Sequence, residues 1–182
     1  MTEIDSPAPI LLITGVMAAG KSTVADHLAK RFSRSIHLRG DLFRRMIVNG
    51  RVDMSDDPAA EAMRQLQLRY RAAAQAAKLY SSSGFHVIYQ DVVIGPVLEE
   101  VISIFDGYPL HVVVLCPDEQ TIADREAARD KTGYTQVSIP QLQSALQDTP
   151  QIGLWIDSSN QTVQETADAI VSGLQQAMVF SA

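Results

Sequence analysis

The stretch GVMAAGKST at residues 15–23 follows directly on the apolar run ILLIT at residues 10–14. Gly15 and Gly20 enclose four residues, and Lys21 and Ser22 come next, so the stretch fits the pattern G-x-x-x-x-G-K-[ST] at every defined position. The run before it has the length of a buried strand, and the spacing after it predicts a helix over residues 22–32. A turn of this kind between a strand and a helix is the context in which the pattern binds phosphate.

The turn has the chemistry of a phosphate cradle. Its glycines let the backbone curl tightly, so that successive N–H groups and the start of the helix meet anionic oxygens. Lys21 supplies a mobile positive charge for the β- and γ-phosphates, and Ser22 offers a hydroxyl to Mg²⁺. The sequence therefore predicts ATP and Mg²⁺ as cofactors. The predicted nucleotide-binding residues are Gly15, Val16, Met17, Ala18, Ala19, Gly20, Lys21, Ser22 and Thr23, together with Arg125 from later in the chain.

The composition suits one globular domain of 182 residues, with 46% hydrophobic and 20% charged residues. A net charge of −6 argues against a nucleic-acid partner. Cys116 is the single cysteine, so no disulfide forms within the chain, and a reducing cytoplasm is expected. The acidic start MTEIDSPAP does not resemble a signal peptide, and the apolar runs are far shorter than the roughly 20 residues of a membrane span. The oligomeric state is left open.

Five apolar runs alternate with helical patterns along the chain. The runs lie at residues 10–14, 35–38, 85–90, 110–116 and 153–156, and none alternates strictly, as is typical of parallel strands covered on both faces. Helices are expected from residue 42 and over residues 22–32, 58–82, 96–105, 118–129, 139–147 and 162–177. This order predicts an α/β fold with a parallel sheet between two helical layers. Residues 1–8 are expected to form a flexible tail, and residues 9–182 a single domain.

Two aspartates follow predicted strands. Asp91 comes after the run 85–90, the position of a carboxylate that holds Mg²⁺ directly or through water; a helix cap or a surface carboxylate is the alternative. Asp41 follows the run 35–38, at the same edge of a parallel sheet as the phosphate cradle, where it is placed to accept the proton of an attacking hydroxyl. Asp41 also suits the start of a helix. Arg44, one turn later, is expected to bind a polar or anionic group of an acceptor. Asp41, Arg44 and Asp91 are thus the predicted substrate-binding residues.

A third cluster, DREAARDKTGY at residues 124–134, places Arg125 and Arg129 four residues apart on one helical face. Gly133 then interrupts the helix. Paired arginines that run into a polar glycine loop are typical of a lid that closes over phosphates, here about residues 125–137. A solvated surface helix, with Glu126 paired to Arg129, is the alternative.

The order of these features resembles the small P-loop kinases, which share the adenylate-kinase-like fold. Within that group the chain is most similar to the chloramphenicol phosphotransferase-like proteins and related AAA-type kinases. The resemblance covers roughly residues 9–178 and rests on ITGVMAAGKST, HLRGDLFR, VIYQDVVIG and DREAARDKTGY. It implies a five-stranded parallel sheet in the order 2-3-1-4-5. It also implies Asp41 as general base, with Lys21, Arg125 and Arg129 as catalytic residues.

The chain departs from better-known members of that group. It lacks the Asp-x-Asp and triple-glycine elements of a shikimate kinase and the Asn-Lys-x-Asp guanine motif of GTPases, so ATP is favoured over GTP. Residues 48–63 match no known acceptor site. The sequence thus predicts a phosphotransferase that moves the γ-phosphoryl group of ATP to a hydroxyl of a small metabolite or antibiotic. The alternatives are a nucleoside or nucleotide-sugar kinase, and a regulatory ATPase without an acceptor.

Overall fold

The structure, a computed structural model, describes residues 6–128 and 138–181. Six strands form one sheet: β1 (Ile10–Thr14), β2 (Ser35–Arg39), β3 (His86–Gln90), β4 (Leu110–Leu115), β5 (Leu154–Ile156) and β6 (Met178–Phe180). The helices described are α1 (Lys21–Ala29), α2 (Asp41–Arg45), α3 (Ala60–Ser82), α4 (Val97–Ser103), α5 (Glu119–Ala127), α6 (Ile139–Gln147), α7 (Val163–Ser172) and α8 (Leu174–Ala177). Strands and helices alternate, as the sequence predicts.

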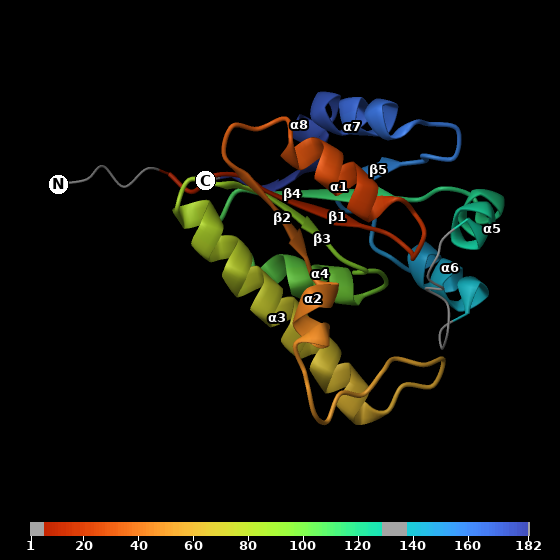
Figure 1. The fold of residues 1–182 in the computed structure, drawn as a ribbon. Helices are drawn as coiled ribbons and strands as arrows, with labels where there is room; N and C mark the ends of the chain where they lie inside the picture. The colour runs from red at the N-terminus through yellow and green to blue at the C-terminus, as the bar shows by residue number, and fades with distance from the viewer. Residues whose placement is uncertain (1–5, 129–137, 182) are drawn as a thin grey trace.

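The sheet has the order β2-β3-β1-β4-β5, and these five strands are all parallel. β1 lies at the centre, where Ile10 pairs with Val87 of β3 on one side and with Leu110 of β4 on the other. Figure 1 shows α1, α7 and α8 on one side of the sheet and α3 and α4 on the other. Helices thus cover both faces, which explains why every residue of β1 is buried and why the strands lack alternation. The predicted fold and sheet order are confirmed.

The C-terminal segment differs from the predicted helix over residues 162–177. α7 ends at Ser172, Gly173 separates it from α8, and Met178–Phe180 forms β6, which runs antiparallel to β4. Gly173 packs so closely against Leu154 that an added Cβ would lie 2.5 Å from its side chain. The break therefore brings the chain against the sheet, where β6 pairs with the first residues of β4, beyond the short β5.

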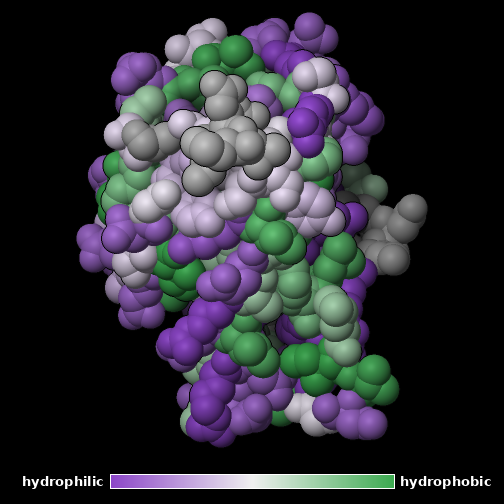
Figure 2. Space-filling view, turned by 90° about the vertical axis from the view of Figure 1, so that its left-hand side faces the viewer, coloured by the Kyte–Doolittle hydropathy of each residue, from purple (hydrophilic) through white to green (hydrophobic). Residues whose placement is uncertain are grey.

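The long helix α3 approaches the sheet closely because its buried side is rich in small residues. Ala73, Ala74 and Ala77 are fully buried. At its end, Ser81 is hydrogen-bonded through both backbone and side chain to Ala8, so the described end of the expected tail is tied to α3. The outward surface is mixed: Figure 2 shows hydrophobic residues in the lower half of the viewed face, crossed by a row of hydrophilic ones. Within the described ranges, no helix is both long and apolar enough to cross a membrane.

Candidate active site

A cavity of about 670 Å³ opens at the carboxyl ends of the parallel strands. This is the edge where ligands bind in open parallel sheets. Residues 17–24 form one wall, from the turn after β1 into α1. The other predicted site residues in its lining are Asp41, Arg44, Asp91 and Arg125, and it also contains Arg39, Arg45, Arg69, Gln90 and Ser158. The structure thus gathers around one cavity the predicted residues that it describes, apart from Gly15 and Val16, which are buried and do not line it.

The turn between β1 and α1 has the backbone of a tight cradle. Gly15 has φ 136° and Gly20 has φ 95°, both in a region that side chains rarely adopt. A Cβ on Gly15 would lie 2.3 Å from the carbonyl oxygen of Leu115, so this glycine also lets the turn pack against β4. Ala18 has φ 61° and is the non-glycine residue with positive φ among those described. Backbone strain of this kind concentrates at functional sites.

Lys21 is the first residue of α1, and its side chain folds back over the turn. Its Nζ donates hydrogen bonds to the carbonyl oxygens of Gly15 at 2.9 Å and Val16 at 2.6 Å. The residue is 7% exposed and lines the cavity. The ammonium therefore sits inside the cradle, where a phosphate chain would meet it.

Asp91 is a buried carboxylate at the end of β3. It accepts hydrogen bonds from the Arg69 guanidinium, from the Tyr89 hydroxyl at 3.0 Å and from the Val92 backbone N–H at 2.7 Å. Burial raises the pKa of the Asp91 carboxyl, and the adjacent positive charge of Arg69 opposes that shift. Its side chain also packs on Gly40, where an added Cβ would lie 1.8 Å from Oδ2.

Arg69 is the main residue of this site that the sequence analysis missed. It stands on α3, 22 residues before Asp91, and its side chain is 11% exposed. The sequence signal was weak, because basic residues at this spacing usually lie on the solvated side of a helix. The pairing of Arg69 with Asp91 cannot be read from the sequence, because it depends on how α3 packs against β2 and β3.

The second predicted aspartate, Asp41, is the first residue of α2 and lies at the end of β2. Arg45 Nη2 lies 2.7 Å from its Oδ2, and Arg39 Nε lies 3.8 Å from its Oδ1. Oδ1 is buried and, within the part of the chain that the structure describes, accepts no hydrogen bond. Asp41 thus both begins the helix and contributes to the lining of the cavity.

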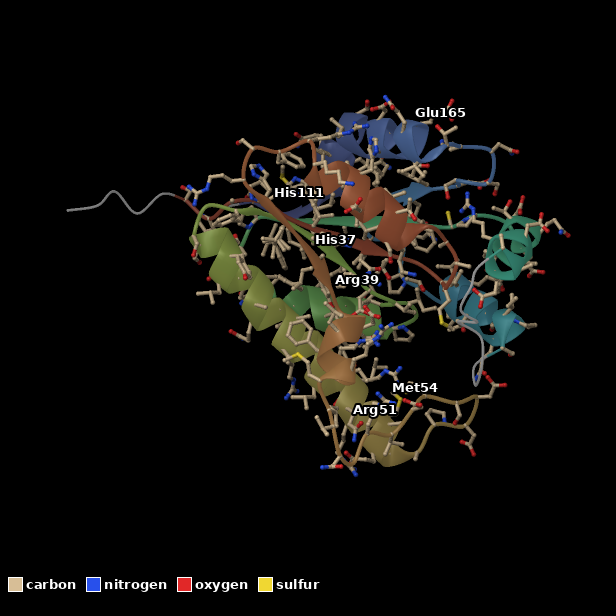
Figure 3. All side chains as sticks on the ribbon, viewed as in Figure 1. His37, Arg39, Arg51, Met54, His111 and Glu165 are labelled. Atoms are coloured by element: carbon tan, nitrogen blue, oxygen red, sulfur yellow. The ribbon has the colours of Figure 1, made fainter. Side chains whose placement is uncertain are left out.

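Arg44 forms an ion pair with Asp53, from the loop between α2 and α3. Burial lowers the pKa of Arg44, and the nearby cations Arg51 and Arg69 lower it further. Figure 3 labels Arg39 at the end of β2 and Arg51 in the loop beyond α2, so basic side chains approach α2 from both ends. Arg44, the cation predicted to bind an acceptor, is therefore one of several basic side chains around α2.

Of the two predicted lid arginines, Arg125 lies on α5 and reaches the cradle. Its guanidinium donates to the carbonyl oxygens of Ala19 at 3.2 Å and Ser158 at 2.8 Å. Arg129, with most of the predicted lid, lies outside the described residues. Arg125 therefore bridges the phosphate cradle and the loop after β5, and it brings positive charge to that side of the cavity.

The donor set fits an Mg²⁺ ion that shares phosphate oxygens. Ser22 presents an exposed hydroxyl in the cavity. Asp91, the other predicted ligand, already accepts three hydrogen bonds, so direct coordination would require it to give up a donor. No group of three His, Cys, Asp or Glu side chains suited to a metal stands together in residues 6–128 and 138–181. Mg²⁺ characteristically keeps several waters and binds through few protein ligands beside substrate phosphates, which matches this arrangement.

Solved structures similar to this chain include kinases and a resistance protein. A sugar kinase from Janibacter sp. HTCC2649 matches with a TM-score of 0.68 at 18% identity, over 94% of this chain and 96% of that one. The APS kinase of Mycobacterium tuberculosis, in complex with AMPPNP and APS, matches at 0.69 and 17%, over 93% and 99%. The tunicamycin resistance protein of Deinococcus radiodurans matches at 0.68 and 19%, over 96% and 99%. Likeness at such low identity establishes a shared fold and leaves the acceptor open.

Sequence comparison identifies the family of the chain. No curated protein sequence matches it significantly. The family model described as AAA domain (AAA_33) matches residues 10–149, which is well over half of the chain and includes the phosphate cradle, both strand-end aspartates and α5. The chain therefore belongs to the AAA domain family AAA_33, and it has the fold of the small P-loop kinases, as the sequence resemblance indicates.

Proposed function

We propose that the protein is an ATP-dependent phosphotransferase that moves the γ-phosphoryl group to a hydroxyl of a small molecule. One observation carries the proposal: the carboxylate of Asp41 lines the same cavity as the phosphate cradle, at the carboxyl ends of the parallel strands. An acceptor hydroxyl in that cavity would donate a hydrogen bond to the carboxylate and direct its own oxygen toward the transferring phosphoryl group. A regulatory ATPase needs no such acceptor.

The roles of the residues follow from their positions. Lys21 and Arg125 would stabilise negative charge on the transferring group, and Arg129 is proposed to add to it from the lid. Asp41 would orient the acceptor hydroxyl and take its proton as the new P–O bond forms and the bond to the β-phosphate oxygen breaks. Ser22 would hold Mg²⁺, which neutralises charge on the β- and γ-phosphates when bound. Most of the catalysis would come from positioning and electrostatics.

The first experiment incubates the protein with Mg²⁺, ATP and pooled hydroxyl-bearing metabolites and antibiotics, and reads phosphorylated products by mass spectrometry. Lys21→Ala is expected to lower product formation on the order of a hundredfold or more, because it removes a charge aimed at the transferring group. Asp41→Asn is expected to lower turnover strongly while the Kd for ATP stays similar. Asp106→Asn, an exposed aspartate outside the cavity, serves as the matched control.

The outcomes separate the candidate functions. A product made by the wild type and the Asp106→Asn variant, and lost in Asp41→Asn, supports phosphoryl transfer with Asp41 in the chemistry. Loss of ATP binding in Asp41→Asn would make this aspartate structural. Tight ATP binding with slow hydrolysis and no product across a broad pool would favour the regulatory ATPase.

A further inference from the structure

A second cavity, of about 190 Å³, lies between α2 and α3, and we call it the side pocket. Its apolar lining residues are Phe43, Met46, Ile47, Leu68 and Ala72. Among the residues that the structure describes, neither strand-end aspartate and no residue of the phosphate cradle lines it. The side pocket is therefore distinct from the cavity that contains the cradle.

Two arginines, Arg44 and Arg69, line both the side pocket and the larger cavity. Each guanidinium is already paired with a carboxylate that does not line the side pocket: Arg44 with Asp53, and Arg69 with Asp91. A long basic side chain whose charged end is engaged elsewhere covers the surface beside it with its hydrocarbon stem. The two arginines thus form a shared boundary between the cavities and add mainly apolar surface to the side pocket.

Gln65 is the third polar residue in the lining, and it is 9% exposed. Its Oε1 accepts a hydrogen bond from Val52 N–H at 2.9 Å, and its Nε2 donates to Gly50 O and to Glu61 Oε1, each at 2.8 Å. Both N–H donors of the amide are therefore used. A polar ligand would give up its hydrogen bonds to water in this pocket without gaining equivalent ones, whereas an apolar ligand has none to lose.

Large apolar side chains of the side pocket are exposed to water. Met46 is 71% exposed and Leu68 is 58% exposed. Figure 2, which views the side of the molecule where α3 lies, shows hydrophobic residues gathered in its lower half. Exposed apolar surface that gathers at a hollow is typical of a ligand site, because a ligand that covers it removes the surface from water.

We propose that the side pocket binds an apolar group of the phosphoryl acceptor, of about the size of a benzene ring. An apolar cavity of about 150 Å³ is large enough to bind benzene, so the side pocket holds one ring with little space left over. Because the two cavities adjoin at Arg44 and Arg69, one acceptor can place its hydroxyl near Asp41 and its apolar group in the side pocket. The inference rests on the proposed function, since it names the class of acceptor: an alcohol with an aryl or branched alkyl group.

The first test measures binding at the side pocket without nucleotide. Benzyl alcohol is titrated into the full-length protein, labelled with ¹³C at the methyl groups of Met, Ile and Leu, and NMR reports which methyl groups respond. We expect the signals of Met46, Ile47 and Leu68 to shift, with a Kd in the millimolar range or tighter. Glycerol, a polar alcohol, should shift none of the three.

Three variants assign the binding to this pocket. Ala72→Leu fills it and should raise the Kd for benzyl alcohol at least about tenfold. Leu68→Ser should raise the Kd about threefold or more; because Leu68 is largely exposed, this variant keeps the test valid if Ala72→Leu fails to fold. Ala60→Leu, the same substitution at an exposed position of α3 outside both cavities, should leave the Kd unchanged. Absence of the methyl shifts, or equal binding in the wild type, Ala72→Leu and Leu68→Ser, overturns the inference.

The second test adds Mg²⁺ and ATP and compares a pool of aryl and branched-alkyl alcohols with a pool of polyols. We expect phosphorylated products from the first pool, and a KM for those acceptors that rises about tenfold in Ala72→Leu while the KM for ATP stays the same. Products from the polyols alone, or an unchanged acceptor KM in Ala72→Leu, would overturn the inference. Absence of product from both pools is a failure of the proposed function, and it is distinguishable because the titration without nucleotide reports on the side pocket separately.

Discussion

Gly40→Ala tests whether the buried carboxylate of Asp91 organises this site. Gly40 has φ −61° and ψ −33°, a conformation that alanine adopts easily, so the substitution adds no backbone strain. The new Cβ would lie 1.8 Å from Asp91 Oδ2 and 2.4 Å from its Cγ. Ordinary contact at about 3.4 Å requires the carboxylate to retreat by about 1.6 Å. A movement of that size breaks the 3.0 Å hydrogen bond from Tyr89 and disturbs the ion pair with Arg69.

The expected cost lies between two limits. Loss of one hydrogen bond to a charged group costs about 1.5–3 kcal/mol, and breaking a buried ion pair costs about 3–5 kcal/mol. We therefore expect Gly40→Ala to lower the free energy of unfolding by about 3 kcal/mol, measured by urea denaturation. This is a large part of the roughly 5–15 kcal/mol typical of a domain.

A double-mutant cycle supplies the control. In an Arg69→Met/Asp91→Ala background the carboxylate is gone and only the Cβ of residue 91 remains, 3.1 Å from the new Cβ, so Gly40→Ala should cost less than about 1 kcal/mol. The reasoning is refuted if Gly40→Ala costs less than about 1 kcal/mol in the wild type. It is refuted equally if the cost is the same in both backgrounds, because the contact with Asp91 would then be irrelevant.

Three further predictions follow from single contacts. Gly15→Ala should lower the free energy of unfolding by more than about 2 kcal/mol and abolish ATP binding, because the added Cβ would lie 2.3 Å from Leu115 O. Gly107→Ala is the control for backbone strain in the same denaturation series, since Gly107 also has positive φ but an added Cβ would meet no atom within 4 Å. Thr162→Ala removes the N-cap of α7 and should cost about 1 kcal/mol, whereas Thr162→Ser should cost little; equal costs would contradict the cap. Burial lowers the pKa of His37 in the folded protein, so below pH 6.5 the unfolded chain binds more protons than the folded one, and stability falls as the pH drops from 6.5 to the lowered pKa. The His37→Gln variant should therefore lose less stability than the wild type between pH 7.5 and pH 5. An identical loss in the two proteins would refute this.

Local patterns were enough for the scaffold and for the turn between β1 and α1. The cradle at residues 15–23 is contiguous in sequence, so its glycines, Lys21 and Ser22 could be assigned from spacing alone. The strands were recognisable because burial on both faces leaves uninterrupted apolar runs. Asp41 and Asp91 could be placed at one edge because parallel strands end at the same side of a sheet. The sequence analysis did not predict β6, because a three-residue strand after a helix has no periodic pattern.

The side of the cavity next to α2 and α3 was decided by tertiary structure. Arg69 meets Asp91 across 22 residues, and the Gly40 backbone lies against the Asp91 side chain. Asp53 reaches Arg44 because Gln65 holds the intervening loop. These contacts depend on how the small side chains of α3 let it pack against the sheet, and no local spacing encodes that distance. The sequence by itself thus determined the fold class and the phosphate cradle, whose physics is local, while only the packed structure brought the separate guanidinium groups together around one cavity.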